Sequence, residues 1–219
     1  MSEQVKKRMI LEYINYFRAF AILSIVAAHT LIWGRGAILQ TNIYLFSGGT
    51  FLFVFISGFL FQYLSDKFEY KTYLKKKFIN VILPFIIIML PIAVSYALSS
   101  SSDISYANTS KIFRFLICFF SGYVVNQSMW YMGMIVIFFL SAPLLLKVKK
   151  NKIFWISCVL CSFIYTLKTN RIPPPVPNIE DGLNNLILID MSFYFKQCFY
   201  FMSAYLIGMV SCDLIKKLT

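Results

Sequence analysis

Long apolar runs separated by short polar stretches dominate the chain. A run of about 20 apolar residues can cross the roughly 30 Å hydrocarbon core of a bilayer as a helix. The runs are continuous and do not alternate between apolar and polar positions, so they predict helices and not the strands of a barrel. The pattern predicts an all-α, polytopic transmembrane helix bundle with six spans, near residues 12–33, 44–64, 78–98, 129–146, 153–168 and 197–215.

A further apolar segment, residues 112–125, is short for a full span and carries Arg114. We expect a re-entrant or interfacial helix there, although a crossing would give seven spans. Cytoplasmic loops are enriched in Lys and Arg. Six spans leave fourteen basic residues inside and six outside, whereas seven spans leave eleven and nine. The predicted topology is therefore a single integral-membrane domain over 1–219, with both termini cytoplasmic and a proline-rich outer loop at 169–185.

Composition and charge support a protein of the cell membrane. Hydrophobic residues make up 59% of the 219 residues, more than a soluble domain of this length can bury. The net charge is +12, but the lysines cluster between apolar runs, where they set topology. We expect membrane lipids or an anionic substrate as their partners, and no nucleic acid. The five cysteines have no framework spacing, and with one histidine in the chain we expect no metal site.

The first apolar run contains Arg18 and the only histidine, His29, within the stretch "NYFRAFAILSIVAAH". Eleven residues bring a helix about 20° past three full turns, so the two residues share a face with Asn15, roughly 16 Å apart along the axis. A guanidinium at that depth costs several kcal/mol unless it finds partners or water. The alternatives are an Arg18 that snorkels to the inner headgroups and a neutral His29 that is hydrogen-bonded within the bundle.

Four segments, in order along residues 13–146, resemble the membrane acyltransferase-3 family. They are the stretch above, "GGTFLFVFISGFLF", "YLKKKFINVILPFI" and "SMWYMGMIVIFFLSAPLLL". The resemblance implies an integral membrane O-acyltransferase used in polysaccharide modification. Such an enzyme moves an acyl group from a cytoplasmic acyl-coenzyme A, a co-substrate and not a bound cofactor, to a hydroxyl of an envelope or exported saccharide or a glycolipid.

Each candidate site residue has a physical reason for its expected role. An imidazole, whose ordinary pKa lies near neutrality, suits a general base, and a cation suits the phosphates of coenzyme A. Ser57 is expected to serve helix packing or substrate contact, and two aromatic residues either line an acceptor path or form an interface belt. The catalytic candidates are His29 and Arg18, and the substrate-binding candidates are Asn15, Ser57, Lys75, Lys76, Lys77, Trp130 and Tyr131.

The sequence departs from the family pattern in three ways. Asn15 stands where the family commonly has an aspartate, and lysines at 75–77 replace arginines, which grip phosphate in a bidentate manner. The family usually has more than six spans, so we expect a short or truncated member, or one completed by a second membrane subunit. Two alternatives stay open. One is a transporter or export-assisting protein for a sugar-linked or anionic lipid, and the other is an inactive short relative that works with a partner.

Overall fold

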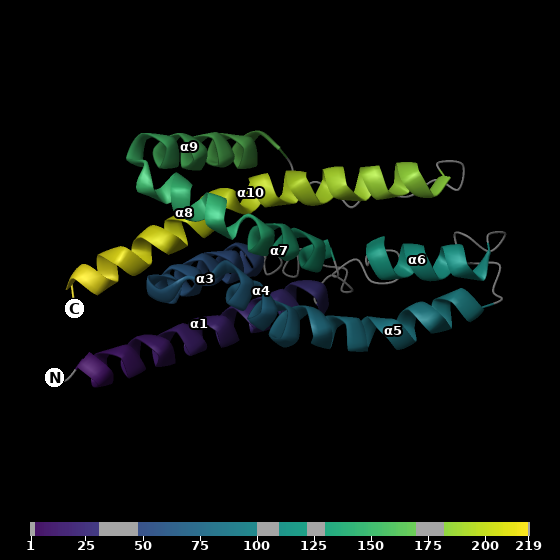
Figure 1. Ribbon diagram of the computed structural model, residues 1–219, viewed down its shortest axis with the longest axis horizontal. Coiled ribbons are helices and arrows are strands. Elements are labelled where there is room, and N and C mark those ends of the chain that lie inside the picture. Colours follow the sequence, from purple (N-terminus) through teal and green to yellow (C-terminus); the bar gives the residue numbers. More distant parts are fainter. Residues whose placement is uncertain (1–2, 31–47, 100–109, 122–129, 170–181, 219) are drawn as a thin grey trace, which may run out of the picture. The chain divides into compact units, whose positions relative to one another are not determined.

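The computed structural model describes residues 3–30, 48–99, 110–121, 130–169 and 182–218 (Figure 1). Within these ranges every regular element is helical, which confirms the all-α class. Short 3-10 and π turns, η2 (Ser65–Lys67) and η3 (Phe78–Ile82), accompany the α-helices. The α-helices are α1 (Glu3–Thr30), α3 (Gly49–Tyr63), α4 (Tyr70–Lys77), α5 (Leu83–Leu98), α6 (Lys111–Ser121), α7 (Trp130–Leu140), α8 (Ala142–Lys150), α9 (Lys152–Lys168) and α10 (Gly182–Leu218).

Two helical stretches of the described residues are long and apolar enough to cross a membrane. One is Tyr70–Leu98, in which α4, η3 and α5 follow one another without a break, and the other is Met191–Lys217 within α10. α7 and α8 form a third if this pair, bent by 60°, counts as one span. The six-span topology, its seven-span variant and the cytoplasmic termini stay predictions.

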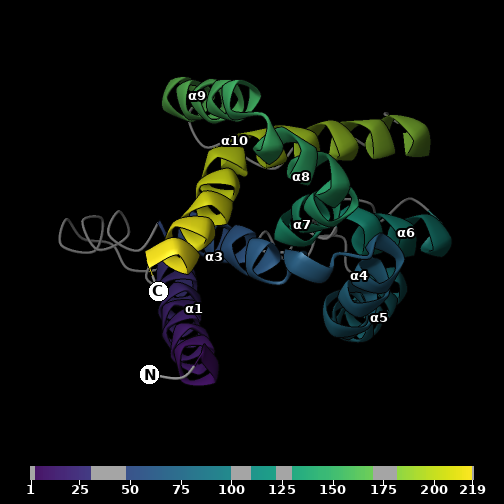
Figure 2. The ribbon, with the colours of Figure 1, turned by 60° about the vertical axis from the view of Figure 1, so that its left-hand side comes forward.

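The described part of the helix predicted at 112–125 is α6, Lys111–Ser121, and residues 122–125 lie outside the described residues. Its 11 residues give a length of roughly 16 Å, about half of a bilayer core. α6 lies alongside α5 (Figures 1 and 2), and the two share a core of Met89, Ala93 and Cys118. A re-entrant or interfacial position for this helix remains a prediction.

The last helix is much longer than the span predicted at 197–215. α10 begins at Gly182, so residues 182–185 of the predicted outer loop 169–185 are helical, and the position of that loop outside the membrane stays a prediction. The chain can continue as one helix because it contains no proline after Gly182 and no further glycine before Gly208. The rest of the predicted loop, apart from Thr169, lies outside the described residues.

The chain forms two compact units whose segments alternate along the sequence. Unit 1 contains residues 1–68, 148–164 and 201–219, and unit 2 contains residues 69–147 and 165–200. α10 contributes its first part to unit 2 and its last part to unit 1. The single domain predicted from the sequence stays a prediction.

Unit 1 is built around close backbone crossings on α3. A Cβ atom added at Gly49 would come within 3.0 Å of Ser24 on α1. At the other end of α3, a Cβ at Gly58 would lie 2.1 Å from the carbonyl oxygen of Tyr205 on α10, and a Cβ at Gly208 would lie 2.1 Å from that of Phe55. Only glycine therefore allows α3 and α10 to approach this closely.

In unit 2, α7 packs between α4 and the first part of α10. The Tyr70 hydroxyl on α4 donates a hydrogen bond to the Leu140 carbonyl oxygen at 3.0 Å. On the other side, the Cys198 thiol on α10 donates to the Met134 carbonyl at 3.2 Å. Gly133 leaves room for the ring of Tyr194, since a Cβ there would come within 2.5 Å of it.

Candidate active site

α1 buries a narrow stripe of its surface, and two residues of its predicted polar face are exposed. Ile14, Ala21 and Ser24 are buried, and the first two join the core that α1 shares with α3 and α10. Arg18 and Asn15 are both exposed. Within unit 1, Arg18 therefore lies on an exposed face of α1, next to the face that packs against α3 and α10.

The spacing between the two catalytic candidates follows from the continuity of α1. The helix includes both Arg18 and His29 without a break, which keeps them roughly 16 Å apart along its axis. His29 belongs to the last turn before Thr30, and its side chain lies outside the described residues.

Ser57 makes its hydrogen bond within its own helix. Its hydroxyl donates to the carbonyl oxygen of Phe53 at 2.9 Å, one turn earlier in α3. This back-bonding is common for serine in apolar helices, where it satisfies a hydroxyl that is removed from water. Together with the neighbouring Gly58 crossing, it favours the packing role of the two expected for Ser57.

The three lysines at the end of α4 have different surroundings. Lys75 and Lys76 are exposed. Lys77 is half-buried, and its Nζ lies 4.9 Å from the ring centroid of Phe139 and 5.5 Å from that of Tyr73. Two aromatic faces stabilise the Lys77 ammonium by cation–π attraction. Lys75 and Lys76 are thus the lysines of this group that a soluble anion reaches most directly.

Trp130 and Tyr131 begin α7 and contact each other edge to face. Their ring centroids are 6.2 Å apart, with the ring planes at 75°. Trp130 is buried and Tyr131 is half-buried. Both residues belong to unit 2, as do the lysines at 75–77, whereas the residues on α1 and α3 belong to unit 1.

Unit 1 contains a cluster of polar residues that the sequence analysis did not predict. The Gln62 side-chain amide on α3 donates to Asp213 Oδ1 on α10 at 2.9 Å, and Lys149 at the end of α8 pairs with Asp213 Oδ2. Nearby in sequence, Lys216 pairs with Asp66 at 2.8 Å. Gln62 and Asp213 fall within predicted spans. A polar residue within an apolar run was therefore the signal that could have identified them. Their pairing across 151 residues was not readable from the sequence.

The second unpredicted feature is Arg114 on α6, which has a buried side chain with 6% of its surface exposed. Its Nη1 donates to the carbonyl oxygen of Ser99 at the end of α5, at 2.7 Å. The sequence indicated only that a cation argues against a full span at 112–125. Its burial depends on how α6 packs, which no local pattern specifies.

Comparison with known proteins identifies one family. A family model described as an acyltransferase domain, that of acyltransferase-3, matches residues 11–218. The matched range contains every candidate site residue predicted from the sequence. Neither a curated protein nor a solved structure matched the chain.

Proposed function

The chain belongs to the acyltransferase-3 family, and from this premise we propose that it is a membrane O-acyltransferase acting on envelope or exported saccharides. The acyl donor is a cytoplasmic acyl-coenzyme A, and the acceptor is a hydroxyl group of the saccharide or glycolipid. The observation that carries the proposal is the family match over residues 11–218, which includes an uninterrupted α1 with both Arg18 and His29.

In the proposed reaction, His29 acts as the general base. Its neutral imidazole takes the proton of the acceptor hydroxyl as the hydroxyl oxygen bonds to the thioester carbonyl carbon. The carbon–sulfur bond then breaks, the acyl group stays on the acceptor oxygen as an ester, and the coenzyme A thiolate takes up the proton. Imidazole suits both steps because its ordinary pKa lies near neutrality.

Arg18 positions the donor in this proposal. Its guanidinium is exposed, as a group that contacts a soluble anion must be, and it stands about three turns before His29 on the same helix. The pantetheine arm of coenzyme A separates the phosphates from the thioester, so the phosphates can lie near Arg18 while the thioester lies toward His29. Lys75 and Lys76, which are exposed in unit 2, add to the positive charge that attracts the anionic donor to the protein surface.

The test is His29→Ala in a strain whose own gene has been deleted. Mass spectrometry of envelope glycans measures the acyl group. The wild-type gene should restore the acyl mass and the His29→Ala gene should not, because general-base catalysis increases the reaction rate by roughly 10²–10⁴-fold. Leu23→Ala is the matched control, because Leu23 is 67% exposed on the same helix. It should restore acylation, and both variants should reach the membrane at wild-type levels. Acylation retained by His29→Ala would exclude the assigned base.

A further inference from the structure

Arg114 carries a buried charge that the described residues compensate only in part. A guanidinium has five N–H donors. Nη1 donates to the Ser99 carbonyl, while Nε is buried and has no hydrogen-bond partner among the described residues. The ion pairs Lys149–Asp213 and Lys216–Asp66 do not involve Arg114.

The described residues around Arg114 supply little negative charge. Ser99 ends α5, so the negative end of that helix dipole offsets part of the charge. Cys118, one turn along α6, is fully buried in the core that α5 and α6 share. The adjacent α5–α6 core is apolar or aromatic and includes Phe115 and Phe119. A buried cation in such surroundings is costly unless an anion joins it.

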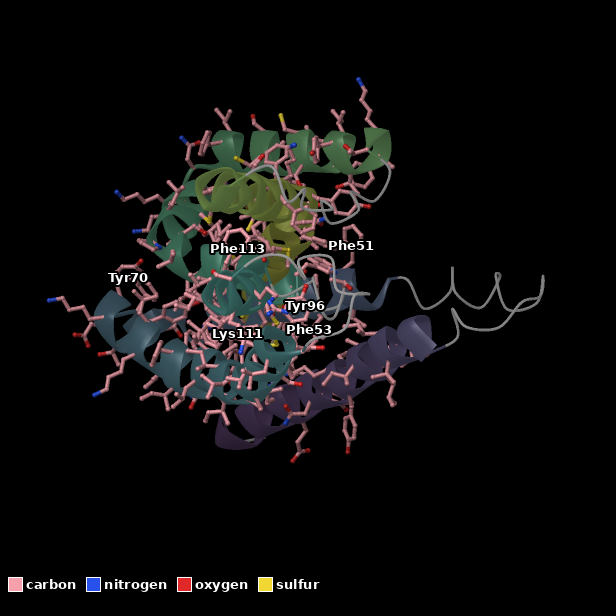
Figure 3. All side chains as sticks on the ribbon, turned by 90° about the vertical axis from the view of Figure 1, so that its right-hand side faces the viewer. Phe51, Phe53, Tyr70, Tyr96, Lys111 and Phe113 are labelled. Carbon is pink, nitrogen blue, oxygen red and sulfur yellow. The ribbon has the colours of Figure 1, made fainter. Side chains whose placement is uncertain are left out.

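A second cation lies three residues earlier on α6. Lys111 is exposed, and residues three apart on a helix are neighbours on its surface. Figure 3 labels Lys111 on α6 and Tyr96, a half-buried residue on α5. The order along α6 is therefore an exposed ammonium followed by a buried guanidinium. An anion can be attracted by the first and bound through the planar fork of the second.

We propose that Arg114 and Lys111 bind the oxyanion group of an acidic acceptor, such as the carboxylate of a uronate sugar. This inference rests on the proposed acyl transfer to a saccharide. It also fits the topology expected from the sequence, which places residues 99–110 on the outer side of the membrane. The role of this site is to select the acceptor by its charge.

Glucuronate is the probe, and the full chain in phosphatidylcholine nanodiscs is the sample. Calorimetric titration should show glucuronate binding to the wild type at constant ionic strength, and no binding of uncharged glucose. Arg114→Gln should weaken glucuronate binding by roughly tenfold or more, as expected for loss of a charge-assisted bond. Lys196→Gln removes an exposed cation elsewhere in unit 2 and should leave the binding unchanged.

A further variant and the choice of conditions keep the result interpretable. Should Arg114→Gln fail to fold, Lys111→Gln at its exposed position should still weaken binding by roughly threefold. The titration contains no acyl donor, so its result is separate from the outcome of acyl transfer.

Three results would overturn the proposal. The first is no glucuronate binding by the wild type. The second is binding that neither Arg114→Gln nor Lys111→Gln weakens. The third is Arg114-dependent stabilisation by phosphatidylglycerol nanodiscs without glucuronate binding, which would assign the oxyanion to a lipid headgroup.

Discussion

At the scale of single residues, surroundings decide which cations can serve a ligand. Lys75, Lys76 and Lys77 are consecutive and chemically identical, yet Lys77 lies over two aromatic rings and its neighbours are exposed. Arg18 and Arg114 differ in the same way, since one guanidinium is exposed and the other is buried. Charge alone therefore does not identify the residues that bind the donor.

Replacing Lys75 and Lys76 by alanine should weaken the use of acyl-coenzyme A. We expect the KM for the donor to rise by roughly three- to tenfold, because each exposed lysine contributes a screened attraction to the donor phosphates. The kcat should change little, and the effect should shrink at high salt. Release of free coenzyme A thiol by purified protein in liposomes provides the measurement.

Lys152→Ala is the charge-matched control for these variants. Lys152 is also exposed, but it begins α9 and is not among the substrate-binding residues predicted from the sequence. The KM of this variant should stay at the wild-type value. An unchanged KM in Lys75→Ala/Lys76→Ala at low salt would show that these lysines do not help to attract the donor.

At the scale of helices, unit 1 depends on the crossing of α3 and α10. The rings of Phe51 and Phe201 lie 4.5 Å apart between centroids near one end, and Phe61 approaches Tyr205 at 6.1 Å. In the same crossing, Gly58 and Gly208 bring backbone against backbone. Small residues at such crossings allow dense packing between apolar helices, which lipid alone does not drive.

Gly58→Ala should destabilise this crossing. The added methyl would overlap the Tyr205 carbonyl oxygen, and overpacking of this kind costs about 1–3 kcal/mol. We expect a lower thermal unfolding midpoint for the protein in detergent micelles. Gly48→Ala is the control, since a Cβ there meets nothing within 4 Å. Equal midpoints for the two variants would show that the crossing tolerates a side chain.

At the scale of the whole molecule, the polar cluster around Asp213 joins three separate parts of the sequence. Lys149→Met should lower the free energy of unfolding by about 1–3 kcal/mol. The substitution leaves the partly buried Asp213 carboxylate with the Gln62 amide as its remaining partner among the described residues. Lys150→Met, the exposed neighbour, should have little effect. Thermal unfolding of the purified variants measures the difference.

A double variant separates the Lys149–Asp213 interaction from other effects of the substitutions. Lys149→Met/Asp213→Leu should cost less than the sum of the two single variants, since neither charge is then left alone. Strict additivity would contradict an energetic role for the pair.

The sequence was sufficient to predict the helical class, the family and the position of most helices, because apolar runs and local motifs depend only on residues that are close together in the sequence. It placed Arg18 and His29 on one helix, and α1 includes both. It did not anticipate that Arg114 is buried or that Gln62 reaches Asp213, because both depend on contacts between distant segments. It also missed the start of α10 at Gly182, since Asn184 and Asn185 resemble loop residues and helical context overrides that preference.

The discontinuous make-up of unit 1 has a consequence for biosynthesis. α3 leaves the ribosome long before residues 201–218, the segment of α10 that packs against Gly58. Throughout that interval, lipid tails or the insertion machinery must cover the surface of α3 around Gly58. Unit 1 can therefore close only late in translation, which makes the nascent chain vulnerable to quality-control proteases at that stage.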